Sequence, residues 1–214
     1  LMFIFPSGIP SGAGGYQPAG ALYFDGSADY LMWTPSVAGN RKTFTYSFWM
    51  KRAELGHDEY VFTAGDSNTA YGWYHANTDI AYMNFNTSTA NNFISSGKFR
   101  DPSAWQHIFV SFDTANSVKK VFINGLEPSA STDNNPSADE EHEIMNTVEH
   151  RIGSTLSEPS STFHGYLADF VFIDGTYHAT PVDVFGEFDS TTGVWVPKDP
   201  SGLTFGTNGF WLDF

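Results

Sequence analysis

The chain has 214 residues, with 24 Asp and Glu against 10 Lys and Arg, which gives a formal net charge of −14. This acidic excess argues against general binding to nucleic acid or to an anionic membrane surface, because both require clustered basic side chains, and only Arg151 falls between Val121 and Pro197. The chain has no cysteine, which excludes disulfides, thiolate metal sites and cysteine nucleophiles.

The first 20 residues are expected to form an N-terminal arm. Residues 1–5, Leu-Met-Phe-Ile-Phe, lack a basic region and are too short for a secretory signal, so we expect an edge strand or a segment that packs on a neighbour. Residues 6–20 hold five Gly and three Pro, which is typical of a loop or linker. No apolar run approaches the ~20 residues of a membrane span, so we expect no membrane insertion.

Short aromatic-rich runs separated by turn residues follow, a pattern typical of a β-sandwich or barrel. The aromatic content of 17% against 16% charged residues predicts a substantial core. The runs expected to form strands are 21–24, 30–33, 44–50, 60–64, 72–75, 80–85, 105–113, 119–125, 150–153 and 165–173. Two of them, 105–113 and 119–125, are expected to form a hairpin that turns at Asn116-Ser117. Trp49, Trp105 and Phe170 are expected core residues, and Asp25-Gly26 and Asn124-Gly125 are expected turns.

Two segments depart from this pattern. Residues 127–149 carry seven acidic residues and no Lys or Arg, so we expect an exposed loop, because so much like charge is costly to desolvate. From Pro181 the strand pattern weakens. We expect one helical turn at 181–187 and short extended pieces at 195–197 and 209–212. The chain stops in mid-pattern, so we expect it to be a segment of a longer polypeptide.

Four motifs in order resemble the laminin-G-like, or concanavalin A-like lectin/glucanase, family. They are ALYFDG at 21–26 followed by DYL at 29–31, FTYSFWMK at 44–51, WQHI at 105–108 through VFING at 121–125, and IGS at 152–154 followed by FHGYLADF at 163–170. The resemblance covers about residues 21–178 and implies an all-β fold, a two-sheet antiparallel jelly-roll sandwich. We therefore expect an arm at 1–20, a jelly-roll domain at 21–180 and a C-terminal extension at 181–214.

The C-terminal residues carry a narrower resemblance. The segments FIDG at 172–175, FGE at 185–187, GVWVP at 193–197 and GTNGFWLDF at 206–214 are similar to lectin-like segments of bacteriophage structural proteins. This resemblance implies a component of the virion surface, such as a tail, fibre or capsid-decorating protein. Its expected partners are other virion proteins or copies of itself, together with cell-surface glycans if it binds any.

No catalytic constellation stands out. Retaining glycosidases need two carboxylates about 5 Å apart, which on one strand face requires alternate positions, and no expected strand carries such a pair. His142-Glu143 begins like a zinc-protease helix, but Asn146 stands where the second His is needed. We therefore expect no enzymatic activity and keep a glycoside hydrolase as a distant third alternative.

Two kinds of binding site have candidate residues. Family members bind calcium at the rim of the sandwich, and Asp66, Asn68, Asp79 and the acidic segment supply the oxygen ligands that Ca²⁺ prefers; the alternative is solvated acids without an ion. Glycans stack on exposed aromatic side chains, and the best local cluster is Tyr71, Trp73, Tyr74 and Asn77.

Consecutive residues of a strand point to opposite faces, so Trp73 and Tyr74 cannot both face one core. Either of them lines a glycan site, or one packs inward while the other covers a subunit contact. We expect a non-catalytic virion surface module held to its neighbours by the apolar arm and the aromatic tail. The alternative is a lectin for host or environmental glycans with Trp73 and Tyr74 in its site.

Overall fold

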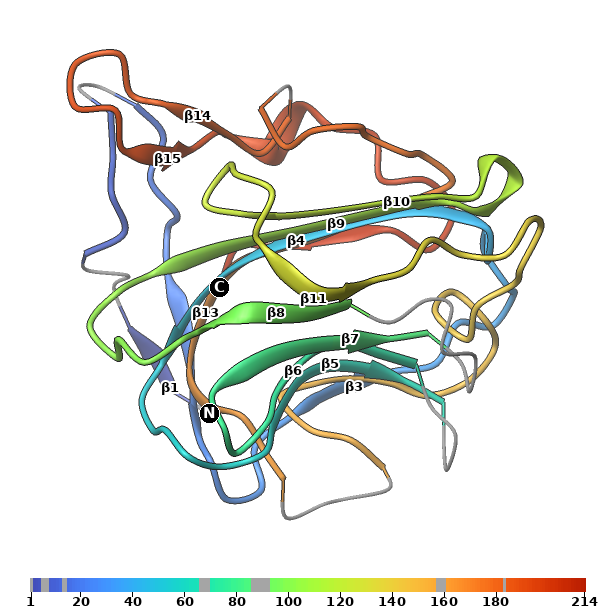
Figure 1. The fold of residues 1–214 in the computed structure, drawn as a ribbon, viewed down its shortest axis with the longest axis horizontal. Coiled ribbons are helices and arrows are strands. Elements are labelled where there is room, and N and C mark those ends of the chain that lie inside the picture. The colour runs from blue at the N-terminus through green and yellow to red at the C-terminus, as the bar shows by residue number, and fades with distance from the viewer. Residues whose placement is uncertain are drawn as a thin grey trace.

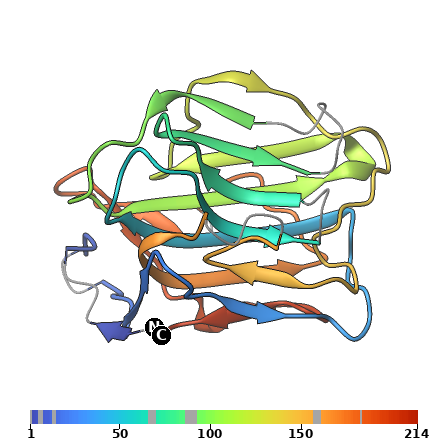
Figure 2. The same ribbon diagram turned by 90° about the horizontal axis from the view of Figure 1, so that it is seen from below.

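The computed structural model describes residues 2–4, 8–12, 15–65, 70–85, 93–156, 161–182 and 184–214. They form two antiparallel seven-stranded sheets packed face to face (Figure 1), and Figure 2 shows that the strands of both layers run in nearly the same direction. The expected all-β, two-sheet jelly-roll sandwich is confirmed. None of the described residues forms a helix long and apolar enough to span a bilayer.

The first sheet is built around a long central strand. Its order is β1 (Met2–Ile4), β2 (Ala21–Asp25), β13 (His164–Asp174), β4 (Thr43–Arg52), β9 (Gln106–Asp113) and β10 (Val118–Ile123), and β16 (Phe210–Leu212) also pairs with β13. Strand β2 pairs with residues 164–167 of β13, and β16 pairs with residues 170–172. The change of partner falls at Asp169, whose φ of 45° is left-handed and marks a β-bulge. Residues 2–4 thus form the edge strand expected of the arm.

The second sheet includes two strands that the sequence pattern does not predict. Its order is β11 (Ala130–Asp133), β8 (Phe93–Lys98), β7 (Ile80–Asn84), β6 (Ala70–His75), β5 (Glu59–Ala64), β12 (His150–Ile152) and β3 (Leu31–Trp33). The unpredicted strands are β8 and β11, which lie at one edge of the sheet. Their sequences, FISSGK and ASTD, lack the apolar alternation by which a half-buried strand is identified.

Aromatic side chains fill the space between the sheets. The fully buried aromatic members of this core are Phe24, Phe44, Tyr46, Phe48, Phe62, Trp73, Phe85, Phe93, Phe112, Phe163, Phe170 and Phe172. Tyr46 is the one tyrosine in this set, and its hydroxyl donates to the carbonyl oxygen of Gly72 over 2.7 Å. The core thus buries a large aromatic area with its tyrosine hydroxyl paired.

The outer face of the first sheet is covered by the C-terminal residues. Trp195 packs with Trp49 and Trp105, while Val184 and Phe185 pack on Phe109 and the neighbouring residues of β13. The covering segment contains β14 (Gly186–Phe188) and β15 (Trp195–Pro197), which pair with each other, and the 3₁₀ turn η3 (Pro200–Gly202). The extended pieces expected at 195–197 and 209–212 are confirmed. Trp49 and Trp105 are buried as expected, but in this outer layer rather than between the sheets.

The expected hairpin and turns are also present. Strands β9 and β10 pair in register around the 3₁₀ turn η2 (Thr114–Asn116), and Ser117 adopts the left-handed conformation that reverses the chain. At 181–185 the carbonyl of Pro181 accepts from the amides of Val184 and Phe185, which forms a single turn before β14 begins. The domain boundaries at residues 20 and 180 stay predictions.

The expectation that all of residues 127–149 form an exposed loop is wrong. This segment contains β11, and His142, Ile144 and Met145 are fully buried. The acidic side chains alternate with them and point outward, where Arg41 donates to Glu141 over 2.7 Å and to Glu143 over 3.4 Å. Alternation therefore lets one short segment bury apolar side chains while its carboxylates stay hydrated or paired.

Candidate functional site

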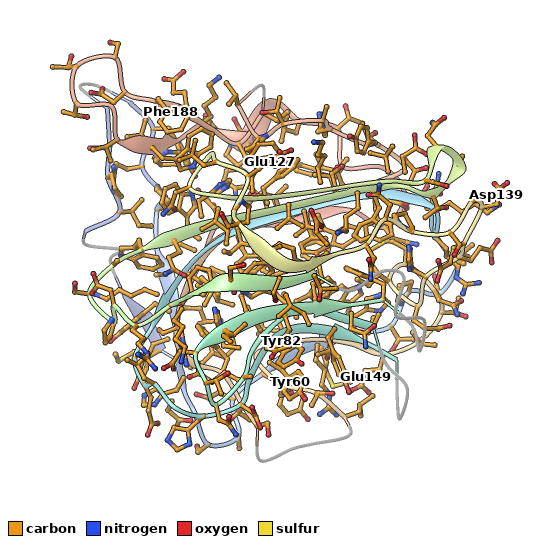
Figure 3. All side chains as sticks on the ribbon, viewed as in Figure 1. Tyr60, Tyr82, Glu127, Asp139, Glu149 and Phe188 are labelled. Atoms are coloured by element: carbon orange, nitrogen blue, oxygen red, sulfur yellow. The ribbon has the colours of Figure 1, made fainter. Side chains whose placement is uncertain are left out.

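Four tyrosines gather on the outer face of the second sheet. Tyr60 comes from β5, Tyr71 and Tyr74 from β6, and Tyr82 from β7. Trp73 and Met83, the sequence neighbours of Tyr74 and Tyr82, belong to the core between the sheets, so strand alternation directs these two tyrosines outward. Register shifts in the pairing of β5 with β6 bring Tyr60 and Tyr71 to the same face, where their rings contact that of Tyr74. Tyr71, Tyr74 and Tyr82 are half-buried and Tyr60 is buried, and Figure 3 shows Tyr60 and Tyr82 on the same side of the molecule. We call these four residues the tyrosine face.

Three of these tyrosines form a ladder across the strands. Tyr74 lies in register with Tyr60 on one side and Tyr82 on the other. The ring centroids are 5.0 Å and 4.9 Å apart, and the interplanar angle is 21° in both pairs. Nearly parallel rings at this separation overlap in an offset stack. The ladder therefore presents the half-buried rings of Tyr74 and Tyr82 to an approaching ligand, while the buried ring of Tyr60 supports them from one side.

Tyr71 closes the cluster from the side. Its ring centroid lies 5.0 Å from that of Tyr60 at an angle of 48°, and 5.5 Å from that of Tyr74 at 66°. Each cross-strand aromatic pair contributes on the order of 0.5–1.5 kcal/mol beyond its area burial. The four rings thus hold one another in place, so a ligand meets a surface that is already ordered.

A charged pair lies on the same face. His150 and Ile152 are buried, so Arg151 between them points outward, in register with Met32 of β3 and Thr63 of β5. Its guanidinium carbon lies 4.4 Å from the ring centroid of Tyr30.

Hydrogen bonds fix the position of the Arg151 side chain. Its Nε donates to Oε1 of Glu149 over 2.6 Å, and its Nη1 donates to the carbonyl oxygen of Thr155 over 3.3 Å. Thr63 of β5 lies in register with Arg151 on one side and with Tyr71 on the other. Strand β5 therefore lies between the Arg151–Glu149 ion pair and Tyr71. The face therefore combines aromatic rings with a fixed donor and a fixed acceptor.

The sequence-predicted glycan residues divide into three groups. Tyr71 and Tyr74 lie on the tyrosine face. Trp73 is fully buried in the core, so the prediction that it lines a glycan site is wrong. Consecutive strand residues point to opposite faces, and with Tyr74 on the outer face Trp73 points inward. Asn77 is exposed at the β6–β7 turn, where its backbone N–H donates to Oδ1 of Asp58 over 2.8 Å, and it lies beyond the ladder.

Sequence reasoning missed Tyr60, Tyr82 and Arg151. Tyr60 stands in an apolar run that reads as core, and its place beside Tyr74 depends on strand pairing. The alternation Ile80-Ala81-Tyr82-Met83 carried a usable signal for Tyr82, since it places Tyr82 and Met83 on opposite faces. Arg151 is the sole basic residue in a long stretch, a signal that was visible without the structure.

The candidate calcium ligands receive little support. Asp66 and Asn68 lie outside the described residues. Both oxygens of Asp79 already accept hydrogen bonds: Oδ1 from the amide of Gly56 and from Arg52, and Oδ2 from Arg100. Burial acts to raise the pKa of Asp79, but these donors outweigh it and hold the pKa below its usual value. Asp79 is therefore a partner for two guanidinium groups and not an open ligand for a cation.

No group of three or more His, Asp or Glu within the described residues is arranged to hold a metal ion. Arg52 does bring two carboxylates together, because its Nε donates to Glu59 over 2.6 Å while its Nη1 donates to Asp79 over 3.2 Å. Both acids are buried, and burial raises the pKa of Glu59 to about 6. Because both acids are buried, a polymeric substrate does not reach this network.

Known proteins share this architecture. The sequence profile of the Concanavalin A-like lectin/glucanases superfamily matches residues 25–183, and no curated protein sequence matches the chain. A native heptameric SAP-like pentraxin from Limulus polyphemus superposes with a TM-score of 0.58 at 14% identity, over 90% of each chain. A putative carbohydrate binding protein from Bacteroides ovatus has a TM-score of 0.53 at 13% identity, over 83% of this chain and 51% of that one. A sialidase from Trypanosoma rangeli has a TM-score of 0.53 at 13% identity, over 79% and 26%. At these identities the likeness concerns the fold.

Proposed function

Because the chain belongs to the concanavalin A-like lectin/glucanase superfamily, we propose that it is a non-catalytic carbohydrate-binding module and that its tyrosine face binds glycan. The observation that carries the proposal is the ladder of Tyr60, Tyr74 and Tyr82 on the outer face of the second sheet. The outer face of the first sheet packs against the chain's own C-terminal residues. The Bacteroides ovatus neighbour, whose description names carbohydrate binding, supports the ligand class at the level of the fold.

A sugar ring has two kinds of surface, and the tyrosine face matches both. The apolar C–H groups of a sugar pack on aromatic carbon, and its hydroxyl groups exchange hydrogen bonds with phenol hydroxyls, which both donate and accept. Arg151 and Glu149 add a cationic donor and an anionic acceptor held 2.6 Å apart. Because their charges offset each other, the face suits a neutral glycan that lies across the strands.

The expected affinity for one sugar unit is low. A hexose has about 12 non-hydrogen atoms, and at about −0.3 kcal/mol per atom it gains about −4 kcal/mol. This free energy corresponds to a dissociation constant of about 1 mM. Useful retention on a glycan-coated surface would therefore come from several sugar units of one chain or from several copies of the module.

The test is a titration of a glycan selected on an array, followed by calorimetry or NMR, with variants of the tyrosine face. Tyr74→Ala removes the centre of the ladder and is expected to weaken binding at least tenfold. Tyr74→Phe keeps the ring and measures the hydroxyl separately. The matched control is Tyr23→Ala, since Tyr23 is a half-buried tyrosine of β2 in the first sheet whose ring also packs on a neighbouring tyrosine, Tyr166. Equal affinity of wild type and Tyr74→Ala would exclude this face.

A second role, display on a virion surface, is favoured by the N-terminal strand. Strand β1 lies at the edge of the first sheet and pairs with β2 over three residues, and Met2 is exposed. An exposed edge strand is a ready site for pairing with another chain. Because Ile9 is buried with Trp49, Trp105 and Trp195, removal of residues 1–5 tests this role without opening that cluster. We expect the truncated protein to stay folded and to lose its association with purified particles; association that persists would contradict the role.

A further inference from the structure

A polar groove lies where the two sheets come apart. Strand β10 is the edge of the first sheet and β11 is the edge of the second, and Figure 1 shows β11 facing the strands of the first sheet. Between them is a cavity of about 310 Å³, at the lower end of the ~300–1,000 Å³ typical of small-molecule sites. It is lined by Phe93, Val118, Lys119, Lys120, Val121, Glu127, Pro128, Asp133 and Asn135. This set is called the edge groove.

The ammonium group of Lys119 lies at the base of the groove. Its side chain is 1% exposed and forms an ion pair with Asp133, and its Nζ lies 5.9 Å from the ring centroid of Phe93. Burial lowers the pKa of Lys119, although the hydrogen bond and charge of Asp133 act in the opposite direction. Asp133 is itself well exposed, with 64% of its side chain accessible. A buried cation is thus balanced by a carboxylate that a ligand can reach.

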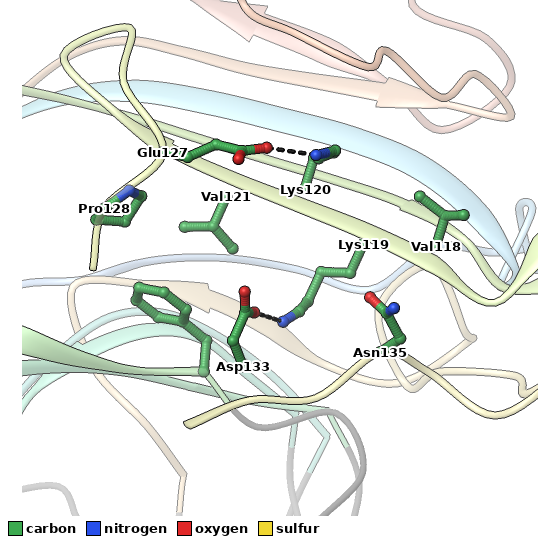
Figure 4. Close-up of a pocket in the computed structure, with 9 residues that line it drawn as sticks. Val118, Lys119, Lys120, Val121, Glu127, Pro128, Asp133 and Asn135 are labelled. Atoms are coloured by element: carbon green, nitrogen blue, oxygen red, sulfur yellow. Dashed lines mark hydrogen bonds and ion pairs between the residues drawn. The ribbon is translucent and has the colours of Figure 1, made fainter. Parts of the chain in front are cut away.

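A second ion pair stands at the rim. Lys120 donates to Glu127 across the mouth of the groove, as Figure 4 shows. Asn135 adds an amide near Lys119, and Val118, Val121 and Pro128 supply apolar surface. The lining therefore alternates hydrogen-bonding groups with small apolar patches.

The charges of the lining select the class of ligand. Two ammonium groups and two carboxylates cancel, so the groove gives no net attraction to an anion, and the chain as a whole carries a net charge of −14. A wholly apolar ligand would strip water from Asp133, Lys120 and Glu127 without replacing their hydrogen bonds, which is costly. A neutral polyol is the remaining match, because each of its hydroxyls donates to a carboxylate and accepts from an ammonium group.

We propose that the edge groove is a second binding site, separate from the tyrosine face, that takes one neutral pyranose unit. In this site, sugar hydroxyls bond to Asp133, which the buried Lys119 holds in place, and to Lys120 and Glu127 at the rim, while the C–H face of the ring lies on Pro128. The two sites belong to different parts of the molecule. A glycan chain held by both would gain avidity without a high affinity at either.

The test follows backbone amide shifts of the full chain by NMR while methyl glycosides of glucose, galactose and mannose are added to about 20 mM, some twenty times the ~1 mM dissociation constant expected for one unit. At least one glycoside is expected to give saturable shifts at residues 118–121 and 127–135. Lys119→Met is expected to weaken that binding at least tenfold. Asp133→Asn keeps an oxygen that accepts from the buried Lys119 but loses the carboxylate charge; it is expected to weaken binding as well, and it covers the case in which Lys119→Met fails to fold.

Tyr74→Ala distinguishes this proposal from the function proposed above. The groove shifts are expected to stay within twofold of wild type in Tyr74→Ala, whereas any shifts at the tyrosine face are lost. Shifts in the groove that do not saturate with any of the three glycosides would overturn the proposal. Saturable shifts of equal affinity in Asp133→Asn would also overturn it, and so would tighter binding of methyl glucuronide than of methyl glucoside, since the site would then select an anion.

Discussion

The indole Nε1 of Trp211 donates a hydrogen bond to Oδ1 of Asp169 over 3.0 Å, and the hydroxyl of Tyr16 donates to the same oxygen over 2.9 Å. Asp169 occupies the bulge of β13 and is 5% exposed. One buried carboxylate on the central strand therefore ties the N-terminal segment and the last strand to the first sheet. This tie, together with the packing of Trp195, keeps the outer face of that sheet covered and leaves the second sheet to present the tyrosine face.

Two substitutions separate the hydrogen bonds of Asp169 from its charge. Asn keeps an acceptor oxygen and tolerates the left-handed backbone, whereas Ala leaves the donors of Tyr16 and Trp211 without this acceptor. Asp169→Ala is therefore expected to be less stable than Asp169→Asn by about 2–4 kcal/mol. Urea denaturation of the two variants measures the difference. Equal stability would show that the carboxylate does not hold the two segments.

Buried titratable groups make stability depend on pH in two opposing ways. Burial raises the pKa values of Asp169 and Glu59 to about 6, so the folded protein binds protons that the unfolded chain does not bind between pH 6 and 4. Burial lowers the pKa values of four histidines: His107 to about 3, His142 and His150 to about 4, and His75 as well. Below pH 6.5 these histidines are protonated only in the unfolded chain.

The four histidines take up protons only in the unfolded state, and the two carboxyl groups take up protons only in the folded state. The unfolded state therefore binds two more protons, so the free energy of unfolding is expected to fall as the pH drops from about 6.5 to about 4, by roughly 2–3 kcal/mol per pH unit. Asp169→Asn removes one offsetting group. It is expected to be more stable than wild type above pH 6, and this gain is expected to vanish towards pH 4. Urea midpoints across this range test both statements, and a gain that persists unchanged at pH 4 would contradict the buried, raised pKa of Asp169.

A pair of glycines isolates the packing of Trp195. Gly125 and Gly193 both have left-handed φ values, of 76° and 69°, but a Cβ on Gly125 would overlap the Trp195 ring, whereas one on Gly193 meets nothing within 4 Å. Gly193→Ala is expected to cost about 1 kcal/mol from backbone strain alone. Gly125→Ala adds the overlap and is expected to cost a further 1–3 kcal/mol or so. Similar thermal midpoints for the two variants would argue that the C-terminal layer is loosely packed.

The buried Arg52 network is expected to matter far more than the surface ion pairs. Arg52→Ala leaves Glu59 and Asp79 buried without their shared cation, and the expected loss is about 3–5 kcal/mol. The control is Lys42→Ala, which removes an exposed pair with Asp139 and is expected to cost under ~1 kcal/mol. Denaturant unfolding of both variants gives the comparison, and a loss from Arg52→Ala as small as the control's would mean that water reaches the network.

Trp73 and Tyr74 are neighbours in sequence with opposite roles, so their alanine variants are expected to differ in kind. Trp73→Ala empties a fully buried site and is expected to cost about 3–5 kcal/mol of stability. Tyr74→Ala removes stacking on a half-buried face, costs less, and affects glycan retention in a folded protein. Circular dichroism beside the binding assay separates the two. A Trp73→Ala protein of wild-type stability would contradict its place in the core.

The pattern of apolar residues predicts most of the strands, whereas the remaining strands and the tyrosine face follow only from how the strands pair. Strands such as 44–50 and 105–113 can be predicted from their own sequence because large apolar residues recur along them. Strands β8 and β11 carry no such signal, since their form depends on the strands with which they pair. The same limit applies to the site: Tyr71 and Tyr74 were found in one run, but Tyr60 and Tyr82 join them only through the registers of β5, β6 and β7.

The acidic segment shows a different limit. Its net charge correctly implied hydrated carboxylates, but a charge count over 23 residues hides the burial of the individual residues His142, Ile144 and Met145. Burial is decided residue by residue, so an average over a segment cannot separate a solvated loop from one that closes the end of a core.

The most direct measurement of the central claim is a glycan-array screen of the purified protein, carried out once with calcium and once with EDTA. The tyrosine face needs no ion, so we expect saturable binding to a neutral glycan in both conditions, with Tyr74→Ala losing the signal. Binding that disappears in EDTA would move the site to a metal-dependent rim. An array of oligosaccharides with no signal in either condition, from a folded sample presented in several linked copies, would contradict carbohydrate binding altogether.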